Sequence, residues 1–190
     1  PEVLIVTSPH QIMYADYFHI SPGRGATGDM SAFGAAQTKL QVEYDEVLRD
    51  EIIRCGEAAG LQVGTLGQRD PYLDHGTFVP LYFLREAGVD CPILRIGLSG
   101  FSPLDHYRLG QCIAQAVESL DRKAVFIASG DLSHKLRDDG PYGFAPEGPE
   151  FDRQITGAMA AGDFLRFLTM DPALCERAAE CGLRSFQIMA

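Results

Sequence analysis

Four short apolar runs, each bounded by glycine, proline or serine, most constrain the fold of this 190-residue chain. Short continuous apolar runs are typical of strands that are covered on both faces of a largely parallel sheet. The predicted strands are Glu2–Thr7, Leu61–Leu66, Ile93–Leu98 and Ala124–Ala128. A chain that buries such strands needs covering elements on both sides of the sheet.

Helical patterns occupy the segments between these runs. The clearest is Pro103–Leu120, which has apolar residues at helical spacing, Ser102 as a suitable N-cap and Pro103 in the first turn. The other predicted helices are Asp45–Ala59, Phe78–Glu86, Pro149–Ala161 and Pro172–Ala179. Alternating strands and helices predict an α/β domain with three layers, α-β-α, around a central, largely parallel or mixed sheet.

Two long stretches, Pro9–Leu40 and Lys135–Gly148, have no regular pattern, and loops of this length in a compact domain are often functional. No linker rich in proline or serine divides the chain, so we predict a single domain over residues 1–190. The chain begins without methionine and stops inside the apolar run LRSFQIMA. We therefore expect it to be part of a longer polypeptide with a possible fused C-terminal domain.

The net charge of −10 argues against nucleic acid and anionic membrane surfaces as partners. No apolar run approaches the roughly 18 residues of a membrane span. The five cysteines are scattered and contain no CxxC pair, which predicts reduced thiols in a cytoplasmic protein. The acidic surface and the sheet edges leave a homodimer possible.

Residues 23–28, GRGATG, satisfy the pattern of a dinucleotide-binding loop. That interpretation requires the motif to join a strand directly to a helix. The residues that follow, DMSAFG, carry no apolar helical pattern. We therefore predict a flexible loop and no nucleotide site.

Three histidines lie near the ends of predicted elements. His10 follows the first strand, His134 follows the fourth, and His75 lies just before a helix. Ligands of α/β sheets gather at the carboxyl ends of strands, where neighbouring loops converge. With Asp74 and Asp131 close to them in sequence, these histidines are candidates for a shared site.

Other polar residues carry weaker signals. His19 lacks this context, and His106, in the first turn of a predicted helix, is expected to be solvated. Ser133 and the histidine after it diverge in an extended or turn backbone and G-x-S-x-G is absent, so serine hydrolysis is not expected. Glu180 and Cys181 end a predicted helix, and Glu180 is either a solvated helix end or part of a metal site.

Five motifs, in this order along the chain, are similar to one known family: SPH, LDHGTFVPLYFL, ASGDLSH, PYGFAPEGPEFD and ECGLR. They resemble the LigB-type class III extradiol ring-cleavage dioxygenase superfamily. Within it they look most like the Memo-like branch, and there like the N-terminal domain of AmmeMemoRadiSam system protein A. The resemblance covers almost all 190 residues.

The resemblance implies a non-haem Fe(II) ion held by His10, His75 and Glu180. Memo-like proteins can instead present a cysteine at the neighbouring position, which matches Cys181 here. Because Glu180 and Cys181 are adjacent, only one of them is expected to face the metal, and we favour Glu180. His134 matches the acid–base histidine of the family.

The same resemblance implies a catechol-type aromatic substrate and O2. Two neutral imidazoles and a carboxylate on one octahedral face leave Fe(II) with three open positions for them. His134, neutral near pH 7, is the candidate proton carrier, and Asp131 is a candidate to orient a histidine. Tyr142 and Phe144 either wall the substrate pocket or pack in the core.

Two other functions stay open at this point. A Memo-like protein could use its metal site in peptide or partner binding, or in a radical-SAM-linked pathway, without dioxygenase activity. A thiolate at Cys181 also suits zinc, and hence a hydrolase, or copper in place of iron.

Overall fold

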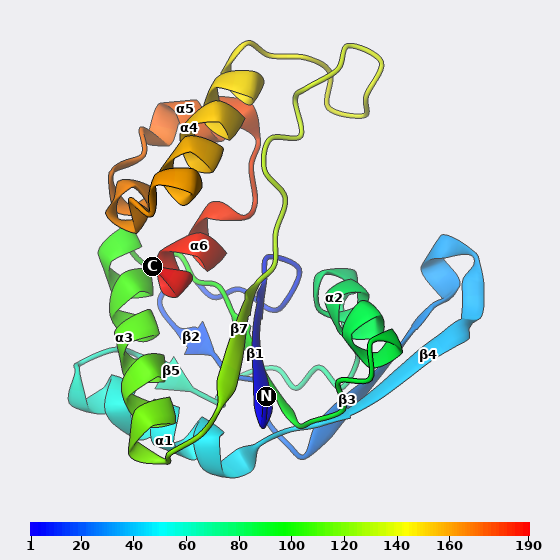
Figure 1. Ribbon diagram of the computed structural model, residues 1–190, viewed down its shortest axis with the longest axis vertical. Helices are drawn as coiled ribbons and strands as arrows, with labels where there is room; N and C mark the ends of the chain where they lie inside the picture. Colours follow the sequence, from blue (N-terminus) through cyan, green and yellow to red (C-terminus); the bar gives the residue numbers. More distant parts are fainter.

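The computed structural model describes residues 1–190. Its centre is a parallel sheet of three strands, β1 (Val3–Ser8), β6 (Ile93–Gly97) and β7 (Ala124–Ala128), in the order β6-β1-β7 (Figure 1). Alternate side chains of β1 enter two separate cores, because Val3 and Ile5 pack on one face and Leu4 and Val6 on the other. Burial of both faces explains why this strand is apolar throughout.

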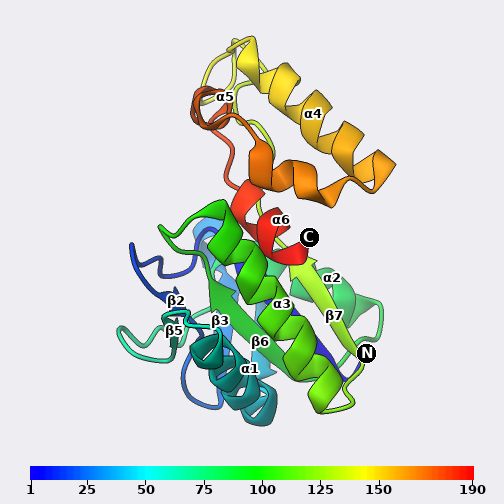
Figure 2. The same cartoon turned by 90° about the vertical axis from the view of Figure 1, so that its left-hand side faces the viewer.

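Helices α1 (Glu46–Ala58) and α3 (Pro103–Ser119) cover one face of the sheet. The other face is covered by α2 (His75–Glu86) and by an antiparallel hairpin of β3 (Gly25–Met30) and β4 (Ala35–Glu43). Figures 1 and 2 show these layers on either side of the strands. The predicted three-layer α/β fold is therefore confirmed.

A helical cap stands beyond the carboxyl ends of the strands (Figures 1 and 2). It consists of α4 (Glu147–Ala161), the 3-10 helix η2 (Phe164–Thr169) and α5 (Pro172–Ala178). Helix α6 (Leu183–Met189) joins it to the sheet, because Phe186 packs in the cap core and Ile188 in the α1–α3 core. The remaining short elements are β2 (Phe18–His19), the 3-10 helix η1 (Ser31–Phe33) and β5 (Val63–Gly64). No helix combines the length and the apolar character that crossing a membrane requires.

The prediction of a strand over Leu61–Leu66 was wrong in extent and in place. Only Val63 and Gly64 are in strand conformation, and they pair with β2 outside the central sheet. Gly67 has a φ of 106°, and a positive φ of this kind breaks a regular strand. The side chain of Leu66 is consequently left exposed.

The predictions of an irregular Pro9–Leu40 and of a flexible loop at residues 23–28 were also wrong, because β3 and the start of β4 lie there. Ala26 and Val42 are the buried side chains of this hairpin, and its other strand positions are exposed or only partly buried. Strand β3, GATGDM, has two glycines and no apolar alternation, whereas Leu40 and Val42 of β4 do alternate with polar residues. By contrast, Lys135–Gly148 is irregular as predicted until α4 begins, apart from an isolated bridge.

His106 is fully buried rather than solvated. Its Nδ1 lies 2.9 Å from the Ser102 carbonyl oxygen, and its Nε2 accepts the Ser99 N–H at 3.4 Å. His106 therefore lies on the side of α3 that faces the core, and one neutral tautomer satisfies both bonds. Burial lowers the pKa of His106 from 6.5 to about 4.

Stability should fall in acid partly because of His106. The unfolded histidine binds a proton below pH 6.5, whereas the folded one resists protonation down to pH about 4. The contribution of His106 to the free energy of unfolding is therefore complete above pH 6.5. As the pH falls to about 4, this contribution of about 3 kcal/mol is lost. Urea unfolding at several pH values should show a shallower pH dependence for His106→Gln. Equal slopes for the two proteins would contradict this role.

Candidate functional site

His10 and His75 lie side by side at the carboxyl edge of the sheet. His10 follows β1 and His75 is the first residue of α2, and their ring centroids are 3.9 Å apart. Both line a cavity of about 210 Å³, together with Ser129, Gly130 and Asp131 of the segment after β7. The structure thus brings together two of the histidines that the sequence singled out.

One buried carboxylate is bonded to the segments that carry both histidines. Asp74 caps α2 by accepting the Thr77 N–H at 3.0 Å, directly beside His75. It also accepts the Ser8 hydroxyl at 2.5 Å, and this hydroxyl accepts the His10 N–H at 3.2 Å. The end of β1 and the start of α2 are therefore held in register.

Arg95 of β6 anchors this carboxylate from inside the protein. Its guanidinium is buried, lies 4.0 Å from Asp74 Oδ2, and donates to the Ser21 hydroxyl and the Asp70 carbonyl. Sequence reasoning named Asp74 but missed Ser8 and Arg95. A charged residue inside the apolar run ILRIG was the available signal for Arg95.

Removing the Ser8 hydroxyl should loosen the histidine pair. We expect Ser8→Ala to lower metal affinity by roughly 10- to 100-fold, as is usual for groups that orient ligands, while the protein stays folded. Isothermal titration with Fe(II) or Zn(II) would measure the affinity. The control is Ser119→Ala, which removes a hydroxyl bonded to Glu51 on the far side of the molecule. Unchanged affinity in Ser8→Ala would show that the bond to Asp74 does not position the ligands.

Burial and the neighbouring His75 lower the pKa of His10. A lowered pKa keeps the imidazole neutral, with a lone pair free for a metal ion. Two adjacent imidazoles with nearby carboxylate and thiol groups are a donor set that first-row transition metals prefer. The residues present therefore fit such an ion.

A second group of donors lies next to this cavity. One donor atom each of Asp131, His134 and Cys181 falls within 4.8 Å of the others. Asp131 Oδ2 is 3.1 Å from His134 Nε2, and the Asp131 N–H donates to Cys181 Sγ at 3.1 Å. Gly130 and Gly182 make this contact possible, since a Cβ on Gly130 would come within 2.4 Å of the Gly182 Cα.

The hydrogen bonds of His134 suit a proton carrier. Its Nδ1 contacts the Ala179 carbonyl oxygen and its Nε2 contacts the Asp131 carboxylate. Both partners are acceptors, so the ring donates to both when it carries the additional proton. Asp131 thus contacts the ring, and its role in orienting His134 stays a prediction.

Glu180 and Cys181 line one cavity but have different hydrogen-bond partners. Glu180 Oε2 accepts the Leu183 N–H at 2.7 Å, and burial raises the pKa of this carboxyl. Both residues line a cavity of about 500 Å³ that shares no lining residue with the histidine cavity. Cys181 Sγ, however, also contacts Asp131. Glu180 is thus not brought into the cavity of His10 and His75.

Aromatic side chains flank the site from two loops. Tyr142 is exposed, with its ring centroid 4.8 Å from that of His134, and Phe144 is exposed nearby in the chain. Core packing therefore does not explain either residue. Phe33 at the hairpin turn, which sequence reasoning missed, has its ring centroid 5.7 Å from that of His75.

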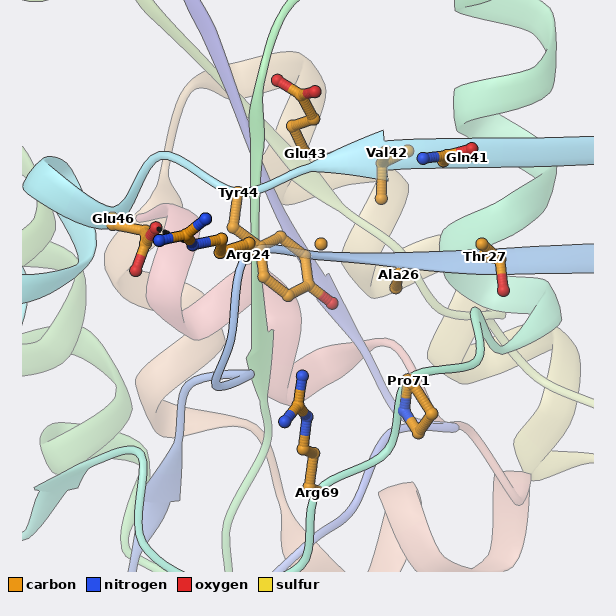
Figure 3. A pocket seen from close by; sticks show the side chains of 11 residues that line it. Arg24, Ala26, Thr27, Gln41, Val42, Glu43, Tyr44, Glu46, Arg69 and Pro71 are labelled. Atoms are coloured by element: carbon orange, nitrogen blue, oxygen red, sulfur yellow. Dashed lines mark ion pairs between the residues drawn. The ribbon is translucent and has the colours of Figure 1, made fainter.

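A larger cavity, of about 620 Å³, lies at the base of the β3–β4 hairpin and contains none of these histidines. Figure 3 shows Arg24 beside Glu46 at one side of it and Arg69 reaching toward Tyr44. Volume alone would therefore direct attention away from the donor cluster.

The fold and the site together define a class of protein. It is an α/β domain with histidine, carboxylate and thiol donors at the carboxyl edge of its sheet. The chain belongs to the LigB family, described as the catalytic LigB subunit of aromatic ring-opening dioxygenase, which matches residues 1–190. This confirms the superfamily that the motifs indicated.

Two relatives illustrate the relationship. Protein CA_C1420 of Clostridium acetobutylicum is 33% identical over 196 residues, covering 100% of this chain and 42% of that protein. The 3,4-dihydroxyphenylacetate 2,3-dioxygenase of Escherichia coli is 27% identical over 182 residues, covering 88% of this chain and 62% of the enzyme. The chain thus spans less than two thirds of the length of either relative.

A solved structure, that of uncharacterized protein JW3007 from Escherichia coli K12, is similar to the whole chain. The TM-score is 0.59 at 16% identity, over 100% of this chain and 75% of that one. At this identity the likeness supports the fold alone.

Proposed function

We propose that residues 1–190 form a single catalytic domain of an iron-dependent oxygenase of the extradiol type, which opens catechol rings with O2. The observation that carries the proposal is the His10–His75 pair beside the His134–Asp131 pair, in a chain of the LigB family. Relatives named as dioxygenases of dihydroxylated aromatic acids support it.

In this proposal His10 and His75 hold the iron, with Glu180 or Cys181 as the third ligand. When bound, Fe(II) supplies open coordination positions for a catechol and O2. His134 accepts a proton from a substrate hydroxyl and later returns it, while the Asp131 carboxylate stabilises the protonated ring. Tyr142 and Phe144 contact the aromatic ring of the substrate.

Oxygen uptake tests the proposal directly. Iron-loaded protein should consume O2 in the presence of a catechol such as 3,4-dihydroxyphenylacetate. His134→Gln should retain iron but lower the rate by about 100-fold or more, the usual contribution of a general acid–base. His19→Gln, which alters a histidine bonded to Leu66 away from the site, is the matched control.

A Memo-like role without ring cleavage is the second candidate. It is favoured by the contact between Cys181 and Asp131, because a thiolate ligand suits zinc or copper better than the iron of a dioxygenase. Such a protein would use its metal in partner or peptide binding or in a radical-SAM-linked pathway. Absence of O2 uptake with a broad set of catechols, in protein that holds stoichiometric iron, would favour this role.

A further inference from the structure

The cavity of about 500 Å³ lies between the helical cap and the carboxyl edge of the sheet. Its walls come from Pro9 after β1, Leu98 after β6, Pro103 of α3 and Leu183 of α6, and seven of its 13 lining residues are hydrophobic. A cavity of this size and character is typical of a site for a small organic molecule. Three prolines among the lining residues make part of the wall rigid.

One cation, the guanidinium of Arg184, lines this apolar cavity. Its hydrogen-bond partner is the Sδ atom of Met13, at 3.5 Å, which is a weak acceptor. The neighbouring carboxylate of Glu180 is bonded to the Leu183 N–H instead. Arg184 therefore retains donors that a planar carboxylate could take in pairs.

We propose that this cavity binds a small monocarboxylic acid with a compact apolar or aromatic body, whose carboxylate pairs with Arg184. The body would lie among the prolines, Leu98 and Leu183. This cavity shares no lining residue with the His10–His75 cavity, and the test below uses metal-free protein. Its ligand would, however, touch Glu180 and Cys181, the two alternative third ligands.

Phenylacetate is a suitable probe, and phenylacetamide is its neutral counterpart of nearly the same shape. Calorimetric titration of the metal-free protein should give a dissociation constant of about 1 mM or below for phenylacetate and much weaker binding of the amide. Arg184→Met, which keeps the aliphatic stem, should weaken phenylacetate binding roughly tenfold or more. Arg184→Lys should lie between the two. Arg177→Met, which removes a guanidinium bonded to Glu147 outside the cavity, should bind like the parent.

Alkylation of the thiols then locates the probe. Cys175 and Cys181 line the cavity, whereas Cys91 lies at another cavity near Arg85. Phenylacetate should slow the reaction of iodoacetamide with the first two thiols and leave Cys91 unchanged, as read by peptide mass spectrometry. The proposal is overturned by no binding, by equal binding of the amide, by full affinity in folded Arg184→Met, or by binding without protection of Cys175 and Cys181.

Discussion

Replacing either His10 or His75 by alanine should lower iron affinity by at least about 100-fold. The two imidazoles are 3.9 Å apart and line one cavity, so loss of either leaves a single imidazole there. Ligand loss should exceed the 10- to 100-fold cost of losing a group that only orients a ligand. Iron content after anaerobic loading and dialysis measures the effect.

The control for this experiment is His19→Ala, which removes a buried histidine bonded to the Leu66 carbonyl. Glu180→Ala and Cys181→Ser, prepared separately, identify the third ligand, since one of them should lose iron as the histidine variants do. Iron retained by both histidine variants at the level of the parent would contradict the proposed metal site and, with it, the proposed function.

Replacing Gly110 by alanine should strongly destabilise the protein. Gly110 lies in α3 at its contact with α6, and a Cβ there would come within 2.0 Å of the Ile188 carbonyl oxygen. Because backbone cannot move aside as a side chain can, we expect a loss of about 1–3 kcal/mol. The midpoint of urea unfolding measures the loss.

Gly157→Ala in α4 is the matched control, because nothing lies within 4 Å of the Cβ it would add. Alanine is a better helix former than glycine, so this variant should gain up to about 1 kcal/mol. If Gly110→Ala were as stable as Gly157→Ala, the close approach of α3 and α6 would not be a feature of the folded protein. The cap would then be held to the sheet by other contacts.

The elements that the sequence predicted well are those whose pattern matches their burial. Strand β1 is apolar because both of its faces are covered, and α3 begins at Pro103 because Ser102 caps it as predicted. The β3–β4 hairpin was missed because β3 has two glycines and few apolar residues, although Leu40 and Val42 of β4 alternate with polar residues. His106 was misjudged although it lies three residues before Leu109 and seven before Ile113, on the face of α3 that packs in the core.

Prediction of the site was limited in the same way. The convergence of His10 and His75 could be expected, since the end of a strand and the start of a helix meet at the carboxyl edge of a parallel sheet. The surroundings of Glu180 and Cys181 could not be expected from the sequence. These residues are adjacent, so only the local backbone conformation decides which way each side chain points. Ala179, with φ of 53°, turns the chain just before them, and nothing in its residue type predicts that conformation.

The bond between Ser8 and Asp74 joins positions 66 apart in the chain. A metal ion that is bound by both His10 and His75 can therefore bind only to protein in which β1 and α2 are already packed together. At a free concentration 100 times its dissociation constant, such an ion would favour the native state by about 2.7 kcal/mol. The melting temperature of the protein should thus report how much metal its surroundings provide.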